Sequence, residues 1–215
     1  MRKLLTVQTD EQKWFAEFRK TDEFAAALAF VWRNGHESSG SFILSDDSYE
    51  YINEFCILIN GVVRSNKNNN LHIGDWYCTL GMKHPFVIEM VKMGWKSGSR
   101  YDREYPQGEF NDEVFIKTYI WLRHDLNRKK SKRRRGIYFS PRLRIYGSGH
   151  VLQRINQHLH KELGISTKTI QLESKKKNIK TINYQSVEEV PRILEYIGAT
   201  ESLERFYSFD LGYQD

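Results

Sequence analysis

Positive charge is concentrated in one short segment of the chain. The run Arg128-Lys-Lys-Ser-Lys-Arg-Arg-Arg135 places seven cationic side chains within eight residues. Guanidinium and ammonium groups at this density bind phosphate oxygens, so the run predicts a phosphate-binding loop that leads into a strand. A solvated loop and a nuclear-localisation tract are the alternatives. The residues assigned to phosphate contacts are Arg128, Lys129, Lys130, Lys132, Arg133, Arg134 and Arg135, together with Lys175, Lys176 and Lys177 at an expected hairpin tip.

A second pattern alternates polar and apolar side chains along expected strands. In residues 142–146, Leu143 and Ile145 are expected to face the core, which leaves the other three side chains on the opposite face. Arginine reads guanine and glutamine reads adenine through paired hydrogen bonds in the major groove, so such rows suit base edges. The alternation around Lys180 is imperfect and leaves its face open. The residues predicted to contact DNA in this way are Arg142, Arg144, Tyr146, Tyr138, Lys168, Gln171 and Lys180, with Arg64, Lys67 and His72 from the first half.

Other arrangements that carry chemistry are not evident. His158 and His160 stand two residues apart on an expected helix and therefore cannot share a face. No glycine-rich phosphate loop and no Ser/His/Asp arrangement stands out. Cys56 and Cys78 lie in apolar surroundings typical of buried thiols rather than of a disulfide framework. We therefore expect no metal site and no cofactor.

The elements that must position these residues occur twice. The first set is a helix at 22–33, a strand at 41–45, a helix at 47–60, strands at 71–73 and 76–80, and a helix at 85–93. The second set is a helix at 112–127, strands at 135–139 and 142–146 turning at Ser140-Pro141, a helix at 151–163, strands at 169–172 and 179–184, and a helix at 187–197. This repetition of helices and strand-like runs predicts two units, each with the order αββαββα.

The charge is divided unevenly between the two units. Residues 1–110 hold 13 Lys and Arg against 15 Asp and Glu, a net charge of −2, whereas residues 111–215 hold 20 against 12, a net charge of +8. A surplus confined to one half predicts a polyanionic partner, above all nucleic acid, although solvation of the surface is the alternative. The expected divisions are an N-terminal helical extension at 1–20, a first repeat at 21–95, a linker at 96–111, a second repeat at 112–198 and a tail at 199–215.

The composition and the tail also bear on partners and location. No apolar stretch approaches the ~20 residues of a membrane helix, so we expect a soluble intracellular protein with no membrane partner. In a bacterium or a phage-infected cell, the location would be cytoplasmic and nucleoid-associated. The aromatic tail is expected to pack against the body, with a partner-docking peptide as the alternative.

Two apolar helices of the repeats carry a family resemblance. Leu28-Ala-Phe-Val-Trp-Arg-Asn-Gly35 aligns without a gap to Leu-Gly-Phe-Ile-Trp-Ala-Asp-Gly, and Phe115-Ile-Lys-Thr-Tyr-Ile-Trp-Leu-Arg-His124 occupies the equivalent place ninety residues later. With the order of elements, these segments resemble the LAGLIDADG homing endonuclease family in its single-chain form, over roughly residues 20–198. The resemblance implies an α+β fold of two pseudo-twofold-related αββαββα units with saddle-shaped antiparallel sheets, in a monomer.

The resemblance also implies a catalytic site, which this chain lacks in its usual form. In the family, one carboxylate at the foot of each motif helix holds a divalent metal ion, and here those positions are Asn34 and Arg123. Asparagine offers one neutral oxygen, and arginine offers none and repels a cation. Asp125 and Glu37 are nearby acids, but Asp125 lies about 200° around the helix from Arg123 and would need a frayed helix end. We expect no catalytic residue, with Arg123 neutralising central phosphates instead.

Together these observations predict a sequence-specific binder of double-stranded DNA, derived from a homing endonuclease and acting as a transcriptional regulator or repressor. The basic second half is expected to supply most of the affinity. The first alternative is an active homing endonuclease or nickase, which would require Mg²⁺. The second is an RNA-binding intron maturase.

Overall fold

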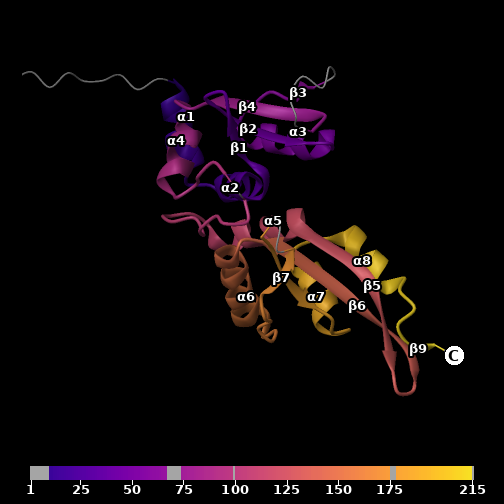
Figure 1. Cartoon of the computed structure of the whole chain (residues 1–215). Helices are drawn as coiled ribbons and strands as arrows, with labels where there is room; N and C mark the ends of the chain where they lie inside the picture. The colour runs from indigo at the N-terminus through magenta and orange to yellow at the C-terminus, as the bar shows by residue number, and fades with distance from the viewer. Residues whose placement is uncertain (1–9, 67–73, 99, 175–177, 215) are drawn as a thin grey trace, which may run out of the picture. The chain divides into compact units, whose positions relative to one another are not determined.

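The computed structural model describes residues 10–66, 74–98, 100–174 and 178–214. The chain forms two compact units (Figure 1), of which unit 1 comprises residues 1–98 and 106–115 and unit 2 comprises residues 99–105 and 116–215. Helix α5 (Asp112–Arg123) begins in unit 1 and continues into unit 2. In the described stretches, no helix is long and apolar enough to cross a bilayer.

Unit 1 contains a four-stranded antiparallel sheet with the order β1-β2-β4-β3. Its elements are α1 (Asp10–Phe18), α2 (Asp22–Asn34), β1 (His36–Ser38), β2 (Ser41–Asp46), α3 (Tyr49–Leu58), β3 (Arg64–Ser65), β4 (Trp76–Gly81) and α4 (Pro85–Lys92). After the short helix α1, the order from α2 to α4 is αββαββα, as expected for each unit, although no strand was expected at the position of β1. The expected strand at 71–73 lies outside the described residues.

Helix α2 ends where the sequence and the packing both require it to end. Its first turn carries Asp22 and Glu23, whose charges favour the positive end of the helix dipole. At the other end, Gly35 turns into extended backbone, and its amide still donates to the carbonyl of Val31 at 2.9 Å. A Cβ on Gly35 would lie 2.6 Å from the ring of Phe42, so glycine is required by close packing against β2.

The core of unit 1 is built from aromatic rings. Phe24, Phe55 and Phe86 are fully buried, and the ring of Phe86 meets those of Phe24 and Phe55 edge to face, with ring centroids 6.0 and 6.2 Å apart. Trp95 packs edge-on against Phe42 at 5.5 Å and thereby joins the segment after α4 to β2. Each such buried ring stabilises the unit by about 2–3 kcal/mol through loss of apolar surface to water.

Unit 2 repeats this topology and adds elements at the C-terminus. After α5, it contains β5 (His124–Arg133), β6 (Gly136–Gly147), α6 (Gly149–Leu163), β7 (Gln171–Ser174), β8 (Ile179–Tyr184), α7 (Glu189–Tyr196), α8 (Thr200–Tyr207) and β9 (Gly212–Gln214). The main path of the sheet is β5-β6-β8-β7, in the same arrangement as in unit 1. Helices α6 and α7 pack on one face of this sheet (Figure 1). The other face is referred to below as the polar face.

Alternation along β6 separates the core from the polar face as expected. Leu143 and Ile145 are fully buried, whereas Arg142, Arg144 and Tyr146 are partly exposed. Ile182 of β8 lies opposite Ile145 and is also fully buried, so the two central strands present a continuous apolar surface to the helices. Burial of side chains at alternate positions sets the register of the sheet, because a shift by one residue would place the arginines in the core.

The first hairpin of unit 2 differs from the expectation. The predicted turn at Ser140-Pro141 is wrong, since both residues lie buried within the single long strand β6. The turn falls instead at Arg134 and Arg135, and the preceding cations form part of strand β5 rather than a loop. Proline lacks a backbone N–H group and is therefore tolerated in a strand only where one side is unpaired. At Pro141, β6 pairs with β5 on one side, whereas β8 pairs with β6 only from Leu143 onward.

The C-terminal tail packs on the body, as one of the two readings predicted. Strand β9 pairs with β6 at Ile137, Tyr138 and Phe139, beyond the point where β8 ends, and so makes the sheet five-stranded rather than four-stranded. The β5–β6 hairpin runs past α7 and α8, and β9 lies along its far half (Figure 1). The tail therefore supports the hairpin that carries the basic run.

Candidate nucleic-acid interface

The polar face of unit 2 collects the arginines and amides of three neighbouring strands. In the register of the sheet, Arg144 of β6 stands opposite Asp125 of β5 and Asn183 of β8, and Arg142 stands opposite Asn127. Directly paired residues share a face, so these side chains gather on the side away from α6 and α7. The sheet register thus places on one surface residues that are up to 58 positions apart in the chain.

Hydrogen bonds hold the arginines of this face in place. The Arg144 Nη2 and Nε atoms donate to Asp125 Oδ2 at 2.7 and 3.0 Å, and Nη1 donates to Glu173 Oε1 at 3.0 Å. Arg142 Nε donates to the side-chain oxygen of Asn127 at 3.0 Å, and Asn127 in turn donates to Asp125 at 2.8 Å. Burial alone would lower the pKa of Arg144, but its bond to Asp125 and the negative charges nearby raise it overall.

This network presents oriented hydrogen-bond donors and acceptors. Asn183 donates to the Gln171 side-chain oxygen at 3.0 Å, so the edge strand β7 extends the same row of amides. Restrained side chains lose little conformational entropy on binding, which favours discrimination between base pairs. Arg144 donates to the carboxylates of Asp125 and Glu173. A new acceptor, such as the edge of a guanine base, would have to replace one of these partners.

The basic run is divided between the two faces of the hairpin. Lys129 and Arg133 alternate with Ser131 on the polar face, where Arg133 stacks on Tyr138 at 3.9 Å and Lys129 reaches Gln185 at 3.3 Å. The residues on the opposite face are Arg128, Lys130 and Lys132. There the guanidinium carbon of Arg128 lies 4.1 Å from the centre of the Phe139 ring, and its Nη1 atom donates to the backbone carbonyl of Asp210 at 3.1 Å.

The strand assignment therefore corrects the interpretation of the run as one phosphate-binding loop. Arg134 and Arg135, at the turn, are exposed. Among the described cations of the run, those that share a face with Arg142 and Arg144 are Lys129 and Arg133, whereas Arg128 is directed to the C-terminal segment.

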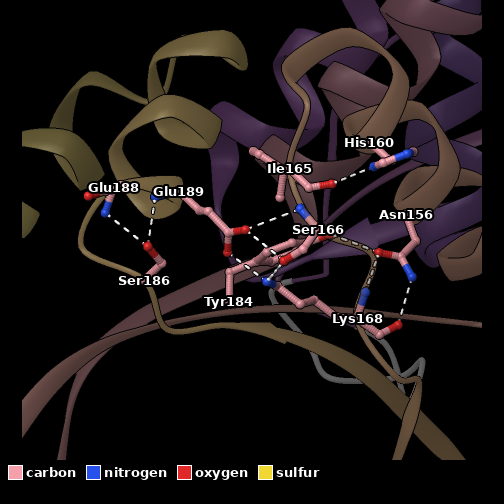
Figure 2. A network of polar contacts seen from close by, with 9 residues as sticks. All are labelled: Asn156, His160, Ile165, Ser166, Lys168, Tyr184, Ser186, Glu188 and Glu189. Atoms are coloured by element: carbon pink, nitrogen blue, oxygen red, sulfur yellow. Dashed lines mark hydrogen bonds and ion pairs between the residues drawn. The ribbon is translucent and has the colours of Figure 1, made fainter.

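Lys168 lies in a different environment from the predicted one. Its ammonium bonds to Glu189 Oε2 at 2.7 Å and to the hydroxyl of Ser166, and it lies 5.4 Å over the ring of buried Tyr184 (Figure 2). Asn156 of α6 binds the backbone of Lys168 on both sides, accepting from its amide at 2.9 Å and donating to its carbonyl at 2.7 Å. This network, on the helix side of the sheet, joins the segment after α6 to α7. We therefore remove Lys168 from the set of DNA-contacting candidates.

Lys180 also lies on the helix side. This residue of β8 stands opposite Gly147 of β6, and it shares a face of the sheet with the buried side chains of Ile182 and Tyr184. A Cβ added to Gly149, at the start of α6, would lie 3.6 Å from the Lys180 ammonium nitrogen. The side chain therefore runs along the N-terminus of α6 and not onto the polar face, which resolves the assignment that the sequence left open.

The foot of α2 carries a neutral side chain that is already engaged. Asn34 is the last residue of the helix, and its amide nitrogen donates to the backbone carbonyl of Ser45 in β2 at 2.6 Å. Glu37, considered above as a substitute acid, is the exposed middle residue of β1 rather than part of α2. The amide of Asn34 thus ties the end of the helix to the sheet of unit 1.

The foot of α5 carries a cation in an aromatic setting. Arg123 ends the helix, and its guanidinium carbon lies 5.7 Å from the centre of the Tyr101 ring. The helix does not fray beyond it, because Asp125 belongs to strand β5 and its carboxylate is bound by Arg144 and Asn127. Within the described residues, no three His, Cys, Asp or Glu side chains are grouped closely enough to hold a metal ion.

The predicted contacts in unit 1 are sparser. Arg64 is exposed in β3, opposite Tyr77 of β4. Lys67 and His72 lie outside the described residues, as do Lys175, Lys176 and Lys177 of unit 2. Gln171 is exposed in β7 and Tyr146 lies beside Arg144 on the polar face, in the positions that alternation predicts.

Sequence reasoning missed several residues of this surface. Asn127 and Asn183 join the polar face through the register of β5 and β8, and nothing in their local sequence marks them. Arg100 and Arg103 lie in the segment expected to be a linker, yet they approach Arg123. If residues 124–133 had been predicted as a strand, alternation would have placed Asn127 on the same face as Arg142.

Comparison with known proteins identifies the fold. No protein-family model matches the chain, and no curated protein matches its sequence. Among solved structures, the N-terminal LAGLIDADG domain of DUF199/WhiA is 15% identical with a TM-score of 0.50, covering 94% of this chain and 98% of that one. Meganuclease I-SmaMI bound to uncleaveable DNA is 8% identical with a TM-score of 0.55 (87% and 89% covered), and the I-LtrWI homing endonuclease bound to target DNA is 11% identical with a TM-score of 0.50 (87% and 89% covered).

These likenesses confirm the resemblance at the level of the fold. The chain has the α+β architecture of LAGLIDADG proteins, with two antiparallel sheets, and the similarity extends over most of its length. At identities of 8–15%, the likeness carries the fold and not the activity.

Proposed function

We propose that this protein binds double-stranded DNA in a sequence-specific manner without cleaving it, and that it acts as a transcriptional regulator or repressor. The observation that carries the proposal is the polar face of unit 2. Its arginines and amides are oriented by hydrogen bonds on the sheet face opposite the one on which α6 and α7 pack. Two structures with the same fold are described as DNA complexes, which supports the choice of duplex DNA as the ligand.

The chemistry at the ends of α2 and α5 supports the proposed absence of cleavage. Divalent metal ions that activate water for phosphodiester hydrolysis need hard, usually anionic oxygen ligands. Asn34 uses its amide nitrogen to bind Ser45, and Arg123 adds a permanent positive charge. Asp125 is committed to Arg144 on the polar face. We therefore propose that the protein binds DNA as a monomer and requires no cofactor.

A selection experiment tests this function directly. Purified full-length protein is incubated with a library of random duplexes, with EDTA in one arm and Mg²⁺ or Mn²⁺ in the other, and the bound DNA is sequenced. We expect the same long, asymmetric site to be enriched in both arms, with uncut strands. Failure to enrich any site would overturn sequence-specific binding.

Two further measurements separate the alternatives. Incubation with supercoiled DNA carrying the selected site and Mg²⁺ or Mn²⁺ would reveal nicked or linear product if the protein were a working endonuclease. Competition of the selected duplex with structured intron RNA would favour the RNA if the protein were a maturase. A-form RNA has a deep, narrow major groove that the polar face could not read, so we expect the duplex DNA to remain bound.

A further inference from the structure

Three arginines of unit 2 converge at the end of α5. Arg100 Nη2 donates to the Tyr101 hydroxyl at 3.2 Å, and its guanidinium carbon lies 5.2 Å from the centre of that ring. The Arg123 guanidinium carbon lies 5.7 Å from the same ring centre. Two guanidinium groups therefore contact one tyrosine, and each of them also acts electrostatically on Arg103. We refer to Arg100, Arg103 and Arg123 as the arginine cluster.

The third member of the cluster is buried among like charges. Arg103 is only 5% exposed. Burial lowers its pKa to about 10, with repulsion from Arg100 and Arg123 acting in the same direction and the nearby Tyr119 hydroxyl acting in the opposite one. At neutral pH the group is still cationic, so the folded protein holds three positive charges close together in a partly dehydrated place.

The side chains of Tyr101 and Tyr119 lie beside the arginine cluster. Tyr119 is buried, and the positive charge of Arg123 acts on its hydroxyl. A Cβ on Gly147 would lie 2.7 Å from the Tyr119 hydroxyl oxygen, so glycine is needed to admit it. The Arg123 Nε atom is buried and has no hydrogen-bond partner among the residues that the structure describes. The cluster therefore has a donor that an additional oxygen ligand would satisfy.

We propose that the arginine cluster is a phosphate-binding site that receives a backbone phosphate of bound DNA, in place of the metal-dependent chemistry for which this fold is known. The proposal rests on the proposed DNA-binding function and specifies where a central contact is made. A phosphodiester matches the cluster because planar guanidinium groups bind tetrahedral oxyanions with paired hydrogen bonds. Its negative charge would also offset the repulsion that acts on Arg103.

Another arginine of the same unit, on the polar face, has carboxylate partners. Arg144 is held by the carboxylates of Asp125 and Glu173, and these partners raise its pKa. In the cluster, by contrast, burial lowers the pKa of Arg103 and repulsion from Arg100 and Arg123 lowers it further, an arrangement that costs stability in the free protein. Costly arrangements of this kind are typical of sites that bind an opposite charge.

The test compares Arg123→Met with Arg205→Met, a control that removes an exposed charge of α8 on the helix side of the unit. Binding of the selected duplex is measured by fluorescence anisotropy in EDTA at several salt concentrations. For Arg123→Met we expect affinity to fall about tenfold and the log–log salt slope to become shallower by about 1, the value for one lost phosphate contact. For Arg205→Met we expect no change in either quantity.

A conservative variant and a small anion keep the result interpretable. Arg123→Lys retains the charge and loses the paired geometry, so it should keep the salt slope and lose only part of the affinity. Inorganic pyrophosphate should raise the Tm of the wild-type protein by about 3 °C at ten times its Kd, and should raise that of Arg123→Met by less.

The outcomes of these experiments distinguish failure of the phosphate site from failure of the proposed DNA-binding function. Wild-type protein that binds the duplex, together with an Arg123→Met variant that keeps its affinity and slope, would overturn the phosphate site and leave the DNA-binding function intact. Equal stabilisation of both proteins by pyrophosphate would also count against the site. Wild-type protein that does not bind duplex DNA would overturn both.

Discussion

The side-chain amide of Asn34 donates a 2.6 Å hydrogen bond to the backbone carbonyl of Ser45. This bond joins the end of α2 to β2 at the position where metal-dependent members of the fold would carry an acid. The nitrogen of the amide makes the contact, which a carboxylate could not do at neutral pH, because an ionised carboxylate only accepts hydrogen bonds. The amide of Asn34 is therefore part of the packing of unit 1.

Replacing this amide should separate the structural from the catalytic role of the position. We expect Asn34→Ala to lower the free energy of unfolding by about 1 kcal/mol, the value for one lost hydrogen bond. Asn34→Asp should cost more, about 2 kcal/mol, because it places a negative charge against the Ser45 carbonyl oxygen. Urea denaturation at pH 7 measures both. An Asn34→Asp variant as stable as the wild type would contradict the role assigned to this bond.

The two faces of the β5–β6 hairpin should contribute differently to DNA binding. Lys129 and Arg133 share the polar face with Arg142, whereas Lys130 and Lys132 point to the opposite face. We expect the double variant Lys129→Met/Arg133→Met to make the log–log salt slope shallower by about 2, since each contact to a phosphate contributes about 0.9.

The matched control is Lys130→Met/Lys132→Met, which removes the same amount of charge from the same strand. We expect its slope to change by less than half as much, measured by anisotropy over the same salt range. Equal effects of the two double variants would show that net charge, rather than the face of the strand, governs affinity, and would argue against a docking surface on the polar face.

Arg144 should govern the choice of base rather than overall affinity. The residue is positioned by Asp125 and Glu173, and a paired contact between arginine and guanine discriminates by about 1–3 kcal/mol. We expect Arg144→Ala to relax the preference at one base pair of the selected site while the other positions keep theirs. The selection is repeated with the variant and the enriched sites are aligned. A uniform loss of affinity at every position would contradict a role in base recognition.

The contact between Glu189 and Lys168 should make part of the stability depend on pH. Burial raises the pKa of Glu189, but hydrogen bonds from Lys168 and Ser166 outweigh it and hold the pKa below its ordinary value. A carboxyl with a lowered pKa in the folded state contributes stability above its unfolded pKa, and that stability is lost as the pH falls through the folded value. The contribution is therefore present at neutral pH and absent in strong acid.

Unfolding in urea at pH 7, 5 and 3 checks this dependence. We expect Glu189→Gln to be less stable than the wild type at pH 7, with the difference shrinking towards pH 3. Glu195→Gln, on the exposed side of the same helix, is the control and should show little difference throughout. A Glu189→Gln deficit that stays constant from pH 7 to pH 3 would show that ionisation is not the cause.

The sequence by itself determined the fold class and the sides of several strands. Apolar repeats at helical and strand spacing predicted two αββαββα units, because burying one face of each element leaves few other arrangements. Alternation placed Leu143 and Ile145 in the core and Arg142 and Arg144 on the other face, and both placements are observed. At the two positions where the family resemblance implies acids, the sequence itself shows Asn34 and Arg123.

The tertiary structure alone decided which of the polar residues act together. Lys168 was expected to contact DNA and the face of Lys180 was left open. The ion pair of Lys168 with Glu189 and the position of Lys180 beside the start of α6 place both residues on the helix side. Pro141 suggested a turn, whereas β9 and β5 together keep the strand continuous on either side of it. The positions of these side chains depend on contacts with residues far away in the sequence. Such contacts cannot be predicted from the residues on either side of a position in the chain. The meeting of Arg103 with Arg123 is of the same kind, since residues 20 apart converge only when the chain folds.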